Sequence, residues 1–204
     1  MSDQDTYDVV GSRTEFRGHI ITVRVDDVRM SDGRVAQRDI VAHPGAVGVV
    51  ALDDDGQIVL VNQYRPAVGA RLDELPAGLL DVDGESALDA AKRELAEEAR
   101  LRADDWHVLV DLHTSPGMTD EAIRLYLARD LHDAAPDSAF TAEHEEITMT
   151  VSREPLAEAV RRVLSGALTN AAAAAGILAA VHGRATGWTE LRPADAPWPA
   201  RPGR

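Results

Sequence analysis

The chain has 204 residues, 45% hydrophobic and 27% charged, which predicts one folded globular domain with at most a small appendage. Its formal net charge of −14 argues against a nucleic-acid polymer as the main partner, because phosphate backbones favour basic surfaces. The absence of cysteine excludes disulfides, thiolate catalysis and cysteine-ligated zinc.

No signal peptide is expected, because residues 1–8 are polar and acidic and lack an apolar core segment. The most apolar stretch, residues 171–181, is too short to span a bilayer and is expected to form a packed helix. We therefore expect a cytoplasmic protein with no membrane partner.

The first part of the chain has the pattern of a small antiparallel sheet. Residues 7–43 alternate apolar and polar side chains, with the clearest strand at residues 20–25 and a Ser-Asp-Gly turn at residues 31–33. We expect residues 1–43 to form an appended sheet subdomain.

A hairpin is predicted next. Residues 46–52 and 57–64 are apolar runs on either side of an Asp-Asp-Asp-Gly turn. The turn is expected to be solvated rather than to bind calcium, because the other ligands of a calcium loop are absent.

The segment at residues 78–101 reads as a turn followed by a helix with two distinct faces. Ser86 can cap the helix N-terminus. Glu94, Glu97 and Glu98 project from one flank, since residues three and four apart are neighbours on a helix. The apolar stripe on the other face consists of Leu88, Ala91, Leu95 and Ala99.

The three glutamates suggest a metal site. Like charges at these spacings destabilise a helix by about 0.2–0.5 kcal/mol per pair, and a bound divalent cation would remove that cost. Magnesium prefers carboxylate oxygens and commonly bridges them to substrate phosphates. The alternative is a solvated acidic helix face without chemistry.

The remaining elements complete an α/β sandwich. Strands are expected at residues 106–112 and 122–128, a polar loop at 132–146, a further short strand, helices at 155–164 and 170–184, and an irregular tail after Trp188. The main domain would span residues 44–187 and the tail residues 188–204.

Residues 78–101 resemble the Nudix box, the signature of hydrolases that act on a nucleoside diphosphate linked to another group. The core from Arg93 to Glu98, Arg-Glu-Leu-Ala-Glu-Glu, matches the family residue for residue, and so do the seven residues between Glu85 and Arg93. One extra residue separates Gly78 from Glu85, and Arg100 replaces a glycine that would adopt a left-handed helix cap. The resemblance implies a Nudix-type α/β/α sandwich with an N-terminal antiparallel β-sheet subdomain.

Further segments resemble the ADP-ribose pyrophosphatase branch of that family. They are Gln-Tyr-Arg at residues 63–65, Leu-Pro-Ala-Gly at 75–78 and Thr-Ser-Pro-Gly-Met-Thr-Asp-Glu at 114–121. In this branch a proline at about the position of Pro116 marks ADP-ribose hydrolases. An ordinary connecting turn is the alternative for that segment.

The resemblance implies roles for individual residues. The metal ligands would be the carbonyl of Ala77 with Glu94, Glu97 and Glu98; the substrate-binding residues would be Arg65, Asp81, Ser115, Gly117 and Glu121; and the catalytic residues would be Arg93, Glu97, Glu145 and Glu146. Arg65 would contact phosphate, with a surface salt bridge as its alternative role. Glu85 would support the site, and Asp81 also has turn-forming chemistry.

The catalytic base is expected in the acidic loop at residues 143–146, with Glu146 the first choice and Glu145 the second. A solvated acidic loop is the alternative. Trp106 is expected in the core without a binding role. The histidines considered, His107, His113, His132 and His144, lack the spacing of paired ligands.

The predicted function is Mg²⁺-dependent hydrolysis of ADP-ribose to AMP and ribose 5-phosphate, with Mn²⁺ as an alternative cation. The alternatives are hydrolysis of other nucleoside diphosphate sugars, a non-catalytic nucleotide sensor, and a structural dimer module. In the resembled branch, such an N-terminal sheet commonly forms an intertwined homodimer with shared active sites. A homodimer is therefore expected, although edge strands are also protected in monomers.

Overall fold

The computed structural model describes residues 7–134 and 148–201 and confirms an α/β sandwich with an N-terminal antiparallel sheet. Its elements in chain order are β1 (Asp8–Arg17), β2 (Thr22–Arg29), β3 (Val35–Ala42), β4 (Ala46–Ala51), β5 (Gln57–Arg65), β6 (Ala70–Glu74), β7 (Ala77–Leu79), α1 (Ala87–Ala99), β8 (Leu101–His113), β9 (Ala122–Asp133), β10 (Thr150–Pro155), α2 (Leu156–Ser165), α3 (Ala171–Ala185) and β11 (Arg192–Pro193).

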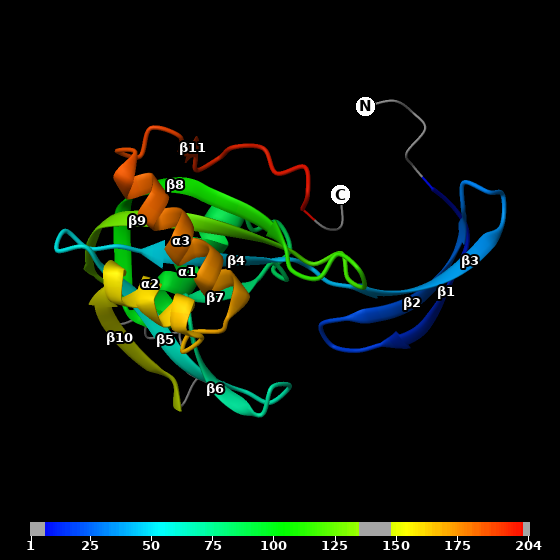
Figure 1. Cartoon of the computed structure of the whole chain (residues 1–204), viewed down its shortest axis with the longest axis horizontal. Coiled ribbons are helices and arrows are strands. Elements are labelled where there is room, and N and C mark those ends of the chain that lie inside the picture. The colour runs from blue at the N-terminus through cyan, green and yellow to red at the C-terminus, as the bar shows by residue number, and fades with distance from the viewer. Residues whose placement is uncertain (1–6, 135–147, 202–204) are drawn as a thin grey trace.

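The N-terminal sheet has the strand order β1-β2-β3 and stands at one end of the molecule (Figure 1). Both of its pairings are antiparallel. The predicted turn between β2 and β3 contains Gly33 with φ 81°, a left-handed conformation that glycine adopts without a Cβ clash. The strand predicted at residues 20–25 begins at Thr22 and runs further than expected.

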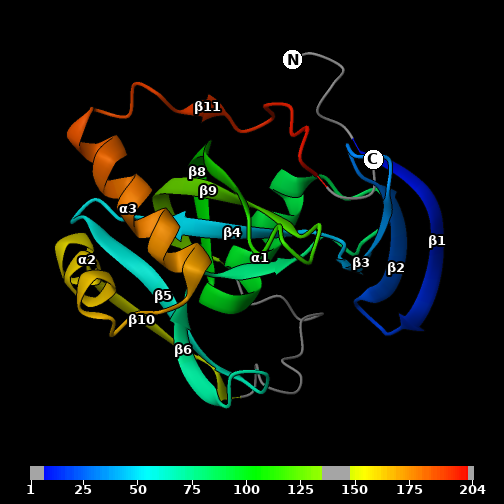
Figure 2. The ribbon, with the colours of Figure 1, turned by 45° about the vertical axis from the view of Figure 1, so that its right-hand side comes forward.

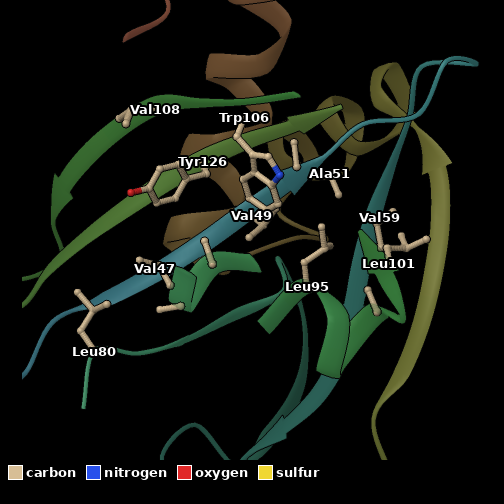
Figure 3. Packing of buried hydrophobic residues seen from close by; sticks show 14 of the residues in the cluster. Val47, Val49, Ala51, Val59, Leu80, Leu95, Leu101, Trp106, Val108 and Tyr126 are labelled. Carbon is tan, nitrogen blue, oxygen red and sulfur yellow. The ribbon is translucent and has the colours of Figure 1, made fainter. Parts of the chain in front are cut away.

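The central sheet has the order β11-β8-β9-β4-β7 and lies between helices (Figure 2). Alternate residues of β4 point to opposite faces. Val47, Val49 and Ala51 pack in a cluster with α1 (Figure 3), while Ala46 and Val50 pack in a second cluster with α2 and α3. Burial on both faces explains why β4 reads as a continuous apolar run.

The predicted hairpin of β4 and β5 is only partly formed. The acidic turn is present, with Gly56 at φ 75° and its N–H donating to the carbonyl of Asp53 at 2.9 Å. Beyond one bridge between Leu52 and Ile58 the strands diverge, and β5 joins a separate sheet of order β10-β5-β6. The prediction of a hairpin is therefore wrong beyond the turn, because β4 pairs with β7 and β9 instead.

Helix α1 is delimited by the residues expected to cap it. The Ser86 side chain accepts a hydrogen bond from the Asp89 N–H at 3.1 Å. At the other end Arg100 adopts the left-handed conformation, with φ 56°, that glycine usually provides. Ala91, Leu95 and Ala99 of the predicted stripe are buried, and the glutamates lie on the flank beside this stripe.

The C-terminal part packs back onto the central sheet. Arg192 and Pro193, within the tail expected to be irregular, pair with β8. Trp198 is 3% exposed and packs beneath the guanidinium of Arg124, which lies 4.8 Å from the ring centroid. Trp106 is buried, as predicted. Over residues 7–134 and 148–201, no helix has the length and apolar character needed to cross a membrane.

Candidate active site

Arg93 lies at the centre of the acidic flank of α1. Its Nε and Nη2 donate to the two carboxylate oxygens of Glu85 at 3.0 and 3.1 Å. Its Nη1 donates to Glu94 Oε1 at 2.6 Å and to Glu97 Oε2 at 3.0 Å. The hydrogen bonds to Glu85, together with the charge of Glu94, raise the pKa of Arg93, so the guanidinium stays charged and offsets the repulsion among the carboxylates.

Glu98 faces strand β7 instead of Arg93. The N–H of Ala77 donates to Glu98 Oε2 at 2.9 Å. Strand β7 pairs with β4 on its other edge. Because the N–H and C=O of one residue point to the same edge of an extended strand, the Ala77 carbonyl is expected on the edge facing α1. The predicted ligand Ala77 and the acidic helix are thus neighbours.

Gly78 allows α1 to approach β7 closely. A Cβ atom at this position would lie 1.9 Å from Glu94 Oε1 and 2.1 Å from its Cδ, distances at which the side chain would have to move. The glycine that opens the Nudix-like motif is therefore needed for Glu94 to lie against the strand.

The donor set suits a hard divalent cation, because it consists of carboxylate oxygens and a backbone carbonyl. As the side chains stand, Arg93 fills the space between Glu85, Glu94 and Glu97. In the part of the chain that the structure describes, no group of three or more histidine or acidic side chains is placed to hold a metal ion. An ion binding here would compete with Arg93 for Glu94 and Glu97.

A pocket of about 460 Å³ adjoins β7. It is lined by Ile20, His43, Ala46, Gly48, Arg65, Glu74, Leu75, Ala77, Gly78, Leu79, Thr114, Glu121, Ile123, Asn170, Ala171 and Ala172. Of the predicted site residues, Arg65, Ala77 and Glu121 meet in this pocket. Asp81 and Gly117 are exposed and do not line it.

Arg65 forms a two-point ion pair with Glu74, a residue that was not predicted to belong to the site. Its Nε and Nη2 donate to Glu74 at 3.0 and 2.6 Å. The Glu74 side chain is 4% exposed, whereas that of Arg65 is 44% exposed. Because a buried carboxylate needs a charged partner, this ion pair has a structural role as well as lining the pocket.

Residues 114–121 form a turn that carries Glu121 into the pocket. The carbonyl of Ser115 accepts hydrogen bonds from the N–H groups of Met118 and Thr119, both at 3.0 Å, so Ser115 contributes to the turn rather than to the pocket lining. The Thr114 hydroxyl donates to Glu121 Oε2 at 2.5 Å. The turn also contacts β3, where Val41 N–H donates to the Met118 carbonyl at 2.8 Å.

His43 was not predicted as a site residue, but it lines the pocket beside Glu121, with His43 Nε2 3.7 Å from Glu121 Oε1. No paired-ligand spacing signalled it. The candidate bases Glu145 and Glu146 lie outside the described residues.

Comparison with known proteins places this site in a family. Residues 42–166 match the model of the NUDIX domain, and residues 7–41 match that of the nucleoside diphosphate sugar hydrolase N-terminal domain. The chain is 48% identical over 202 residues to the ADP-ribose pyrophosphatase of Mycobacterium tuberculosis, covering 99% of this chain and 95% of that protein. It is 40% identical over 116 residues to the ADP-ribose pyrophosphatase of Bacillus subtilis, covering 57% of this chain and 62% of that one.

A solved structure supports the same assignment at the level of the fold. The crystal structure of an ADP compounds hydrolase superposes with a TM-score of 0.76 at 22% identity, covering 93% of this chain and 99% of the other. The matched domain models and the relative that is 48% identical over 99% of this chain make the chain a member of the Nudix hydrolase family, with a three-stranded N-terminal sheet.

Proposed function

We propose that this enzyme hydrolyses ADP-ribose between its two phosphorus atoms and releases AMP and ribose 5-phosphate. The observation that carries the proposal is the contact between α1 and β7, where Glu94 and Glu98 meet Ala77 and Gly78 at the wall of the pocket. The relative that shares 48% identity over nearly the whole chain is named an ADP-ribose pyrophosphatase.

Magnesium would be held by Glu94, Glu97, Glu98 and the Ala77 carbonyl, with Mn²⁺ as an alternative cation. A bound divalent cation would supply charge neutralisation at the bridging phosphate oxygens. Arg93 would remain on Glu85, whose two oxygens hold its Nε and Nη2. The ion would take the place of Arg93 Nη1 as the charged partner of Glu94 and Glu97.

Substrate binding is assigned to residues that line the pocket and to the turn beside it. Arg65, partly exposed and paired with the buried Glu74, would bind phosphate oxygens through its planar guanidinium. Glu121 would bind the terminal ribose, with Ser115 and Gly117 shaping the turn that carries it. Asp81, in the loop between β7 and α1, is the remaining candidate for substrate binding.

The water that attacks phosphorus needs a carboxylate to orient or deprotonate it. We assign this role to Glu146, and to Glu145 as the second candidate. Both precede β10, which pairs with β5, the strand that ends in Arg65.

A homodimer formed through the N-terminal sheet is part of the proposal. The sheet exposes large apolar side chains, among them Val9 at 58% and Phe16 at 56%. An apolar surface of this kind, where it is contiguous, marks an interaction site.

A second candidate function is hydrolysis of other nucleoside diphosphate sugars, which the match of residues 7–41 favours. A panel of ADP-ribose, UDP-glucose, NADH and a nucleoside triphosphate, each incubated with Mg²⁺, separates the two candidates. Fastest turnover of ADP-ribose supports the first, and fastest turnover of UDP-glucose supports the second. Binding of ADP-ribose without cleavage would instead indicate a nucleotide sensor.

A further inference from the structure

His43 occupies the junction between the N-terminal sheet and the central sheet. It follows β3 and precedes β4, and its side chain is 12% exposed at the pocket wall. Its backbone N–H donates to Asp120 Oδ1 at 2.9 Å. The contact with Asp120 therefore fixes the histidine relative to the turn that carries Glu121.

The hydrogen bonds of the His43 ring determine which nitrogen carries the proton. The Gly45 N–H donates to Nδ1 at 3.1 Å. An imidazole nitrogen that accepts a hydrogen bond carries no proton, so the ring proton is on Nε2. The Nε2–H group is therefore a donor on the edge of the ring nearest Glu121.

Glu121 presents an acceptor beside this donor. Its Oε2 is engaged by the Thr114 hydroxyl at 2.5 Å, and its backbone N–H donates to Thr119 Oγ1 at 3.1 Å. Its other oxygen, Oε1, lies 3.7 Å from His43 Nε2, which is longer than a hydrogen bond. The donor and the acceptor stand side by side without bonding to each other.

We propose that His43 and Glu121 together bind two neighbouring hydroxyl groups of a sugar ring, with His43 donating to one hydroxyl and Glu121 accepting from the other. The spacing of Nε2 and Oε1 suits two roughly parallel hydrogen bonds to adjacent hydroxyls. His43 is then a specificity-determining residue for a ribose diol. This inference rests on the proposed function for its substrate, and ADP-ribose contains such a diol in each of its two riboses.

The test measures kcat/KM with Mg²⁺ for ADP-ribose and for analogues lacking one hydroxyl of the terminal ribose or the 2′-hydroxyl of the adenosine ribose. Wild type, His43→Ala and His43→Gln are compared. His182→Ala is the matched control, because His182 also faces a carboxylate, Glu190 at 3.2 Å, but is 67% exposed on α3. Ratios between substrates within one variant are independent of the folded fraction.

Wild type should process one deoxy analogue at least about tenfold less efficiently than ADP-ribose, because a donor or acceptor in the pocket is left unpaired. The analogue that shows this loss identifies which ribose is bound. The quantity compared is kcat/KM for ADP-ribose divided by kcat/KM for an analogue. In His43→Ala this ratio should fall to within about twofold of one for the analogue that lacks the hydroxyl bound by His43, mainly through a higher KM for ADP-ribose. His43→Gln should keep part of the wild-type ratio, and His182→Ala should keep all of it.

Ratios that stay unchanged in His43→Ala for every analogue, or no discrimination by wild type at either ribose, overturn the role of His43 while leaving ADP-ribose hydrolysis in place. Failure of the wild type to cleave ADP-ribose overturns the proposed function and this inference together.

Discussion

At the scale of one residue, substitution of Gly78 is expected to impair catalysis without destabilising the fold. Gly78→Ala would place a methyl group 1.9 Å from Glu94 Oε1, and the flexible glutamate side chain can move aside more easily than backbone can. We expect kcat/KM to fall at least about 100-fold while the free energy of unfolding changes by less than about 1 kcal/mol. Steady-state kinetics and urea denaturation measure the two effects.

Gly33→Ala is the matched control. Alanine at position 33 would have to adopt the left-handed conformation of the glycine, at φ 81°, but nothing lies within 4 Å of the added Cβ. Position 33 is in the turn between β2 and β3 of the N-terminal sheet. This variant should lose about 1 kcal/mol of stability and keep its rate. Equal kinetic losses in both variants would show that Gly78 acts only through the fold.

Glu98→Gln tests the metal ligand set directly. The amide oxygen can still accept the Ala77 N–H, so the contact with β7 survives while the negative charge is lost. Turnover should fall at least about 100-fold with an unchanged thermal midpoint. A near-normal rate at saturating Mg²⁺ would remove Glu98 from the ligands.

Residues of α1 could be predicted from the sequence because their spacing along a helix determines which of them are neighbours. Glu94 and Glu97, three residues apart and so neighbours on a helix, both contact Arg93, and Ser86 caps α1. Glu74 and His43 were not predicted. No sequence pattern distinguishes a buried acid such as Glu74 from a solvated one. A histidine at the end of a strand likewise gives no sign of its neighbour 78 positions later.

At the level of elements, the C-terminal tail stabilises the start of α1. Trp198 packs in the same cluster as Ala87 and Leu88 and beneath Arg124, whose Nη1 donates to the Ala196 carbonyl at 2.7 Å. Trp198→Ala should reduce the free energy of unfolding by about 3–5 kcal/mol, measured by urea denaturation. Leu164→Ala, 75% exposed on α2, is the control and should change it by less than about 0.5 kcal/mol.

Helices could be predicted from local sequence patterns, whereas the pairing of strands could not. The helices α1, α2 and α3 begin and end close to their predicted limits, because caps and apolar periodicity are encoded within each segment. Two partners, β9 for β4 and β10 for β5, come from strands far along the chain, so the apolar runs alone suggested a hairpin of β4 with β5. The shorter β6 and β7, which lie between β5 and α1, are the other partners and were not predicted. The pairing of Arg192 with Val108 had no local signal either.

At the scale of the whole molecule, the exposed apolar side chains of the N-terminal sheet predict self-association. The wild type should be a dimer in sedimentation equilibrium at micromolar concentration. Phe16→Glu should shift it towards monomer, because a charge replaces an apolar side chain that is 56% exposed in one chain. Leu164→Glu, on the exposed surface of α2, should leave the dimer intact. A monomeric wild type would contradict the dimer.

The central claim is that the acids of α1 support cleavage of ADP-ribose between its phosphorus atoms. The most direct measurement is mass spectrometry of the products after incubation of ADP-ribose with the enzyme, with Mg²⁺ or with EDTA. We predict AMP and ribose 5-phosphate in the presence of Mg²⁺ and intact ADP-ribose with EDTA. Recovery of intact ADP-ribose under both conditions, even though it binds, would contradict the claim.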